Sequence, residues 1–225
     1  MSRNEVRIIG GLWKGRKLKV PAGAAVRPSL GRVRETLFNW LAGEVVGSDC
    51  LDLFAGSGAL GFEALSRGAR SVVLVDNNRN TAAVLRKNAQ RLGAANCTVR
   101  RQSALAFLKL AAGARSATGT RNRGGLASSG TDTGAPAGES RMTAPRADDG
   151  VGEAVLRWDI VFLDPPFSSN LLPAALEAIQ GGNALNPGAR IYFELERRSA
   201  FDAHGFTILK EGAAGDTRFG LLASP

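Results

Sequence analysis

The alternation of apolar and polar residues marks the first 45 residues as a unit of their own. Val6–Ile9 and Arg16–Val20 alternate apolar and polar side chains on either side of a glycine-rich turn, which predicts a β-hairpin. Apolar side chains then recur at the spacing of one helical face, at Leu30, Val33, Leu37, Trp40 and Leu41. Ser29 is suited to cap this helix and Gly43 to end it. We therefore expect residues 1–45 to form an N-terminal extension made of a hairpin and a helix.

From Cys50 to about Glu196 the pattern changes to apolar strands that alternate with amphipathic helices. The predicted strands are Cys50–Asp52, Ser71–Val75, Cys97–Arg100 and Trp158–Leu163. This alternation is typical of α/β proteins with a doubly wound, Rossmann-like sheet. Ile208 and Phe219–Leu222 predict a closing antiparallel hairpin, and we interpret Trp40 and Trp158 as core residues. Residues 46–225 thus form the main domain.

Residues 111–152 interrupt this domain. Of the 40 residues 111–150, 28 are Gly, Ala, Ser, Thr or Pro. Such a segment cannot bury enough apolar surface to offset its ordering entropy, so we interpret it as a disordered insertion. Because it follows a helix and precedes a strand, we expect it at the amino edge of the sheet, away from the ligand crevice.

A glycine-rich turn joins the first strand of the main domain to a helix that Gly68 is suited to end. Gly56 and Gly58 let the backbone approach a ligand, and the helix N-terminus offers N–H groups to it. Together with Gly61 and Asp76 this spacing also matches the dinucleotide fingerprint, so the turn alone does not separate NAD from other adenosyl cofactors. S-adenosylmethionine is favoured because its ammonium group, which NAD lacks, suits a carboxylate just before the turn. The cofactor-binding residues predicted here are Asp52, Phe54, Ala55, Gly56, Ser57 and Gly58.

The next two strand ends supply candidate contacts for the adenosine part of such a cofactor. Asp76 ends a strand, and its carboxylate can bind both ribose hydroxyls. Asn77 follows it, and either Asn77 or Asn78 is expected to cap the next helix. Ser103 and Ala104 follow the strand after that, where an adenine edge would be bound.

The tetrapeptide Asp164-Pro165-Pro166-Phe167 closes the apolar strand that begins at Trp158. A carboxylate and the Pro165 carbonyl can accept both hydrogens of an exocyclic amine, while Phe167 offers a face for a flat ring. The two prolines fix φ and lack N–H donors, which holds these acceptors in place. We predict that Asp164, Pro165, Pro166 and Phe167 form the catalytic group.

The charge of the chain is concentrated at its N-terminus. The net charge is +9, and residues 1–40 contribute seven of these charges, with a tryptophan and glycines among the basic side chains. A basic surface with a stacking residue favours nucleic acid. The predicted RNA-binding residues are Arg7, Trp13, Lys14, Arg16, Lys17, Arg27, Arg32 and Arg34.

Composition bounds the remaining possibilities. No uninterrupted apolar stretch approaches ~18 residues, and the N-terminus lacks an apolar signal core. Cys50 and Cys97, each at the start of a predicted strand, are interpreted as buried free thiols. One histidine and two cysteines argue against a zinc site. We expect a cytoplasmic enzyme that needs no metal and no membrane.

In these motifs the chain resembles the class I methyltransferases that modify N2 of guanine 966 in bacterial 16S rRNA. The resemblance covers nearly the whole chain except residues 111–152. The chain differs from the family at two positions. Ser29 stands where the family usually has Thr, and Ser103 stands where the family usually has Asp in the adenine-binding stretch. The matching stretches are Arg7–Gly11, Trp13–Leu18, Arg27–Ser29, Arg34–Trp40, Asp52–Gly61, Asp164–Phe167 and Ala214–Asp216.

The resemblance implies methyl transfer from S-adenosylmethionine to that guanine, with 16S rRNA in a small-subunit particle as partner and the enzyme as a monomer. Three other functions stay open on the residues alone. An adenine-N6 methyltransferase would use the same Asp-Pro-Pro-Phe group on DNA or RNA. A non-catalytic ribosome-assembly factor would need the basic N-terminus but no cofactor. A nicotinamide oxidoreductase would share the glycine turn.

Overall fold

The computed structural model describes residues 5–21, 30–113, 157–167 and 169–224. The expected cap Ser29, the expected RNA contact Arg27 and residues 114–152 of the insertion lie outside these residues. The predicted start of the insertion at residue 111 is wrong, because residues 111–113 form the end of the helix Ala104–Gly113.

The N-terminal extension contains the predicted hairpin and helix. Strands β1 (Glu5–Arg7) and β2 (Lys17–Lys19) pair antiparallel, with Val6 opposite Leu18. Helix α1 (Leu30–Trp40) buries Val33 and Leu37, as its apolar spacing predicts. Trp40 is half-buried at the end of this helix and stacks on Phe219 with ring centroids 5.4 Å apart.

The main domain alternates strands and helices as predicted and closes with a hairpin. Its seven-stranded sheet has the order β5-β4-β3-β6-β7-β9-β8, and β3 to β7 run parallel while β9 is antiparallel to both β7 and β8. The elements are β3 (Asp49–Asp52), α2 (Ala59–Ser66), β4 (Ser71–Asp76), α3 (Arg79–Leu92), β5 (Cys97–Arg101), α4 (Ala104–Gly113), β6 (Trp158–Leu163), α5 (Leu171–Gly182), β7 (Leu185–Glu196), β8 (Thr207–Ala214) and β9 (Thr217–Ala223).

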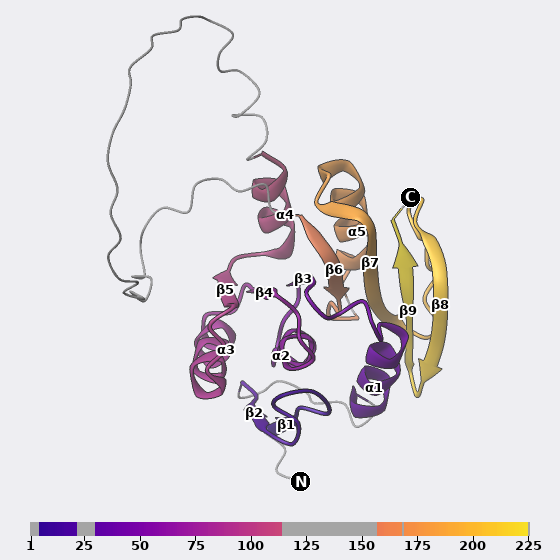
Figure 1. Ribbon diagram of the computed structural model, residues 1–225. Helices are drawn as coiled ribbons and strands as arrows, with labels where there is room; N and C mark the ends of the chain where they lie inside the picture. Colours follow the sequence, from indigo (N-terminus) through magenta and orange to yellow (C-terminus); the bar gives the residue numbers. More distant parts are fainter. Residues whose placement is uncertain (1–4, 22–29, 114–156, 168, 225) are drawn as a thin grey trace, which may run out of the picture.

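Helices cover both faces of this sheet (Figure 1). Phe38 of α1, Phe62 of α2 and Leu85 of α3 belong to one core cluster, which also contains Phe162. Residues of α4 and α5 pack on the opposite face in a second cluster, which contains Trp158. Because successive side chains of a strand point to opposite faces, β6 contributes Ile160 and Phe162 to the first cluster and Val161 and Leu163 to the second.

The sheet order reverses at β3, whose neighbours are β4 on one side and β6 on the other. In open α/β sheets the ligand crevice lies at the carboxyl ends of the strands at such a switch point. The strands that meet there end in Asp52, Asp76 and Leu163, and Asp164 follows Leu163 directly. The described residues on either side of the segment 114–156, the end of α4 and the start of β6 at Trp158, belong to the other, amino edge.

The two cysteines are free thiols, but only one of them is fully buried. Cys50 is buried within β3, and burial raises its pKa to about 12. Cys97 is half-buried, because it begins β5 at an edge of the sheet where fewer neighbours cover it. The expectation of a buried thiol is therefore confirmed for Cys50 and wrong for Cys97.

Candidate active site

Each of the three glycines in the glycine-rich turn is required for a different structural reason. Gly56 has φ 50° and donates its N–H to the Asp76 carboxylate at 3.1 Å. Gly58 has φ 76°, and a Cβ there would lie 2.5 Å from the Phe62 ring. At Gly61 a Cβ would lie 2.3 Å from Leu74, so this glycine lets α2 pack closely on β4. The turn therefore ends with the first turn of α2 held firmly against the sheet.

Asp52 is the most buried carboxylate of the site. Its side chain accepts the Gly61 N–H at 3.2 Å, and the residue is 1% exposed. Its pKa is raised to about 7, chiefly by burial and also by the nearby charges of Asp164 and Asp76, while the Gly61 and Phe54 N–H groups oppose the rise. A buried carboxylate with this environment is stabilised by a cation beside it.

Asp76 stands at the neighbouring strand end and is half-buried. Its carboxylate accepts the N–H groups of Gly56 at 3.1 Å and Asn78 at 2.8 Å. Burial raises its pKa, and these two N–H groups oppose the rise. Asn78, and not Asn77, caps α3, since its side chain accepts the N–H groups of Asn80 and Thr81. Asn77 is exposed at the rim of the cavity.

Ser103 directly precedes α4 and is exposed. Its hydroxyl accepts the Ala106 N–H at 3.2 Å, so the side chain serves as a helix cap. Ser103 and the buried Ala104 line the cavity beside Gln102 and Leu105. The Ser103 hydroxyl keeps its own hydrogen to donate, so it remains a polar group at this end together with the backbone and the Gln102 amide.

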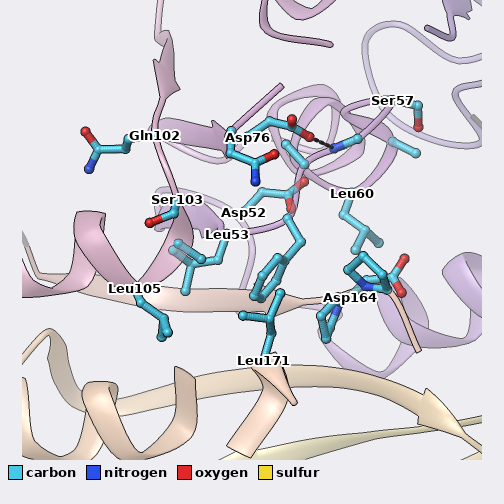
Figure 2. Close-up of a pocket in the computed structure, with 18 of the residues that line it drawn as sticks. Asp52, Leu53, Ser57, Leu60, Asp76, Gln102, Ser103, Leu105, Asp164 and Leu171 are labelled. Atoms are coloured by element: carbon cyan, nitrogen blue, oxygen red, sulfur yellow. Dashed lines mark hydrogen bonds between the residues drawn. The ribbon is translucent and has the colours of Figure 1, made fainter. Parts of the chain in front are cut away.

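A single cavity of about 510 Å³ brings most of the predicted site residues together. Figure 2 shows Gln102, Ser103 and Leu105 at one end and Leu60 and Asp164 at the other, with Asp52 and Asp76 between them. The predicted residues on its wall are Asp52, Phe54, Ala55, Gly56, Ser57, Asp76, Asn77, Ser103, Ala104, Asp164, Pro165 and Pro166. A volume of this size is typical of small-molecule and cofactor sites, which span about 300–1,000 Å³.

Two predicted residues are placed differently. Gly58 is buried under Phe62 and does not line the cavity. Phe167 lines a separate hollow of about 160 Å³, which shares only Pro165 and Pro166 with the main cavity. A ring stacked on Phe167 would therefore occupy this second hollow, on the far side of the prolines.

The sequence interpretation missed the apolar part of the wall. Leu53, Leu105 and Leu171 line the cavity from three separate elements or turns. Leu53 stands inside the glycine-turn motif and was the easiest of them to find. Leu171 begins α5 and carries no local signal, because only the packing of α5 against β6 brings it to the cavity.

The N-terminal hairpin is fixed to the main domain through α2. The Glu63 carboxylate is fully buried and accepts the N–H groups of Ile9 at 2.8 Å and Gly10 at 2.7 Å. Arg67, one turn further on α2, donates to the same carboxylate at 2.8 Å. The hydroxyl of Ser66 accepts the Trp13 N–H at 2.9 Å. These bonds hold the hairpin beside the helix whose first turn lines the cavity.

The basic residues of the extension fall into two groups. Arg7, Lys14, Arg16, Lys17 and Arg32 are exposed, and Trp13 is half-buried in the hairpin turn. Arg34 was expected on the same surface, and this expectation is corrected. Its side chain lies inside the protein, where the Arg34 residue is 3% exposed and its Nε lies 3.7 Å from the Glu63 carboxylate. Burial lowers the pKa of Arg34, and the negative charge of Glu63 opposes this.

Within the described residues, no helix is long and apolar enough to cross a membrane, and no group of three or more His, Cys, Asp or Glu side chains is placed to hold a metal ion. The site instead offers carboxylates to cationic groups, a carboxylate to a ribose and an apolar floor to a base. These features fit S-adenosylmethionine, which carries a sulfonium, an ammonium, a ribose and an adenine. The fold and the site together define a class I S-adenosylmethionine-dependent methyltransferase.

The chain belongs to the family described as "Conserved hypothetical protein 95", whose model matches residues 6–118 and 134–223. It is 37% identical to "Ribosomal RNA small subunit methyltransferase D" of Haemophilus influenzae, over 95% of this chain and 91% of that protein. The solved structure of yhhF from Escherichia coli is 34% identical, with a TM-score of 0.70 and 97% of both chains covered.

A more distant structure supports the fold. The 16S rRNA N2-methyltransferase for guanosine 1207 of Thermus thermophilus, solved with AdoMet and guanosine, has a TM-score of 0.60 at 18% identity. The superposition covers 98% of this chain and 50% of that protein. At this identity the likeness supports the fold alone.

Proposed function

We propose that this protein methylates small-subunit ribosomal RNA, and that its acceptor is N2 of guanine 966 in 16S rRNA. One observation carries the proposal: Asp164 and Pro165 line the same cavity as Asp52 and Asp76. A group that accepts amine hydrogens therefore lies next to the cofactor site. The choice of ribosomal RNA is supported by the Haemophilus influenzae relative, and the choice of guanine by the resemblance of the motifs.

The chemical problem is the low nucleophilicity of an exocyclic amine, whose lone pair is delocalised into the base. S-adenosylmethionine supplies a methyl group on an electrophilic sulfonium. Asp164 and the Pro165 carbonyl would accept the two amine hydrogens and favour a pyramidal nitrogen with its lone pair directed at the cavity. Positioning of this kind lowers the barrier by fixing the reacting groups. The negative charge of Asp164 also stabilises the positive charge that develops on nitrogen.

The acceptor base must leave its stack before the amine can enter the site. Pro166 is exposed and Phe167 is half-buried, so both are accessible from the surface at the hollow next to the cavity. The base would lie over Pro166 with its amine directed past Pro165 into the cavity. This arrangement uses Phe167 as the wall of the second hollow.

The exposed basic residues of the hairpin and α1 would bind the RNA backbone. Lys14 lies in the hairpin turn, Arg16 directly precedes β2, Lys17 is the first residue of β2, and Arg32 lies on α1. Arg16 donates to the Arg91 carbonyl, and Lys17 pairs with Glu5 at 2.7 Å, so both are ordered without being buried. Basic side chains held in this way neutralise phosphates without sequence specificity.

The test is methyl transfer from labelled S-adenosylmethionine to small ribosomal subunits that lack the modification, followed by digestion and identification of the nucleosides. We expect label in N2-methylguanosine at one position. Label in N6-methyladenosine would show that the acceptor is adenine and not guanine, and would leave the proposed roles of the site residues unchanged. No label in RNA, with cofactor binding preserved, would refute the proposed substrate.

A further inference from the structure

Arg34 carries a polar group that the hairpin and α2 do not use. Its Nη2 donates to the Arg7 carbonyl at 2.6 Å, and its Nε lies 3.7 Å from the Glu63 carboxylate. Its Nη1 is buried and has no hydrogen-bond partner among the described residues. Buried donors of charged groups are costly to leave without an acceptor, so this nitrogen indicates a ligand atom.

The same side chain lines the main cavity, and it is the one cation among the described residues of the cavity wall. The other charged groups there are Asp52, Asp76 and Asp164. These carboxylates suit the two cationic centres and the ribose of S-adenosylmethionine. The cofactor also carries one anionic group, the carboxylate of its methionine moiety, for which the three acids are unfavourable neighbours.

A second feature favours an anion on this side of the cavity. Helix α2 begins after Gly58, which provides no side-chain cap for the first N–H groups. Uncapped N–H groups and the helix dipole attract negative charge. Ala59, in the first turn, contacts Val6 and Val20 of the hairpin, and Glu63, one turn on, lies beside Arg34. Arg34 and the start of α2 therefore approach the cavity from the same side.

The position of Asp52 narrows the choice of anion. Asp52 accepts the Gly61 N–H of this same α2 turn, and it is the proposed partner of the cofactor ammonium. In an amino acid the ammonium and the carboxylate are attached to one carbon, so the carboxylate must lie close to the α2 N-terminus as well. We propose that Arg34 binds the methionine carboxylate of S-adenosylmethionine through Nη1, and that this contact holds the cofactor's amino-acid end.

This proposal depends on cofactor binding in the cavity but not on the RNA substrate. It also gives the hairpin a part in the cofactor site, because Arg34 bonds to the backbone of β1 as well as facing the ligand. Arg34 would be a cofactor-binding residue, in place of the RNA contact that its charge suggested.

The experiment compares two ligands and two forms of Arg34 by calorimetry. The ligands are S-adenosyl-L-homocysteine and its decarboxylated analogue, which keeps the ammonium and adenosine and lacks only the carboxylate. Arg34→Met keeps the length and apolar stem of the side chain and removes the charge. Arg86→Met, on an exposed arginine of α3, is the matched control. Arg34→Lys keeps the charge and serves if the methionine variant does not fold.

We expect Arg34→Met to weaken S-adenosyl-L-homocysteine by about 10- to 100-fold, the effect of losing a charge-assisted hydrogen bond, and to change the analogue by less than about threefold. Arg34→Lys should retain most of the preference for the carboxylated ligand, and Arg86→Met all of it. Equal weakening of both ligands would show a purely structural role, and unchanged binding of both would show that Arg34 faces another group. Either result overturns the proposal. Failure of the RNA assay with the ligand preference intact would refute only the proposed substrate.

Discussion

Replacing Asp52 by Asn should make the ligand-free protein more stable at alkaline pH while weakening its cofactor binding. The pKa of Asp52 is about 7 in the folded protein, against an ordinary value of 3.8, because burial disfavours the charged form. Since the raised pKa means that the folded state holds the proton more tightly, stability falls as pH rises from about 4 to about 7. At 1.36 kcal/mol per pKa unit, the ionised carboxylate costs roughly 4 kcal/mol above pH 7.

The expected gain of Asp52→Asn is smaller than this full cost. The Asn oxygen can still accept the Gly61 N–H, but the new amide group faces the Phe54 N–H, which costs about 1–3 kcal/mol. We expect a net stabilisation of about 1–3 kcal/mol at pH 8, and a rise in Tm of roughly 2–10 °C for a chain of this length. At pH 4.5, where the folded wild type holds the Asp52 proton, this gain should be absent and the variant should melt no higher than the wild type.

The assay is thermal unfolding of the ligand-free protein between about pH 2.5 and pH 8.5, with S-adenosyl-L-homocysteine binding measured in parallel. Asp49 at the other end of β3 is the matched control, because hydrogen bonding to Arg70 lowers its pKa. Asp49→Asn should lower stability at neutral pH, and this loss should disappear as pH falls below about 4. A wild-type stability that does not fall between pH 4 and 7, or an Asp52→Asn protein no more stable at pH 8, would refute this account of Asp52.

Three further experiments with substituted proteins test other parts of the structure. Asp164→Asn should reduce methyl transfer by at least about 100-fold and leave S-adenosyl-L-homocysteine affinity within a few-fold, and a parallel loss of affinity would give Asp164 a different role. Glu63→Gln should destabilise the protein by roughly 3–5 kcal/mol in urea unfolding, because it removes the buried charge opposite two arginines, whereas Glu44→Gln on the partly exposed pair with Arg190 should cost less than about 1 kcal/mol. Combined Arg16→Ala and Lys17→Ala should reduce the salt dependence of RNA binding by about two phosphate contacts, while Lys109→Ala on α4 should not, and an unchanged slope would exclude the hairpin from the interface.

The strands and their ends could be predicted from sequence because buried parallel strands are continuous apolar runs. Three of these runs end at or directly before a carboxylate, namely Asp52, Asp76 and Asp164, which marks the strand end in the sequence. Glycine geometry was predicted less completely. The positive φ of Gly58 followed from the motif, but its close contact with Phe62 depends on how α2 packs.

The placement of Arg34 could not be predicted, because its burial depends on a partner far along the chain. A basic residue in a basic segment is normally solvated, and the sequence does not reveal that Glu63 of another helix lies next to it. The same limit applies to Phe167 and Leu171. Phe167 shares its hollow with residues of α5 and of the end of β7, whereas Leu171 of α5 lines the main cavity, and only the packed structure decides which hollow each side chain lines.

The cavity and the segment that the family model leaves unmatched are connected to opposite edges of the sheet. The cavity lies at the carboxyl ends of β3, β4 and β6, whereas the long connection between Gly113 and Trp158 leaves and rejoins the domain at the opposite edge. The family model, which is shared across organisms, does not match residues 119–133 of that connection. A fluorophore or an affinity handle attached at Gly113 or Arg157, the described residues that flank this connection, would therefore stand at the edge opposite the cavity.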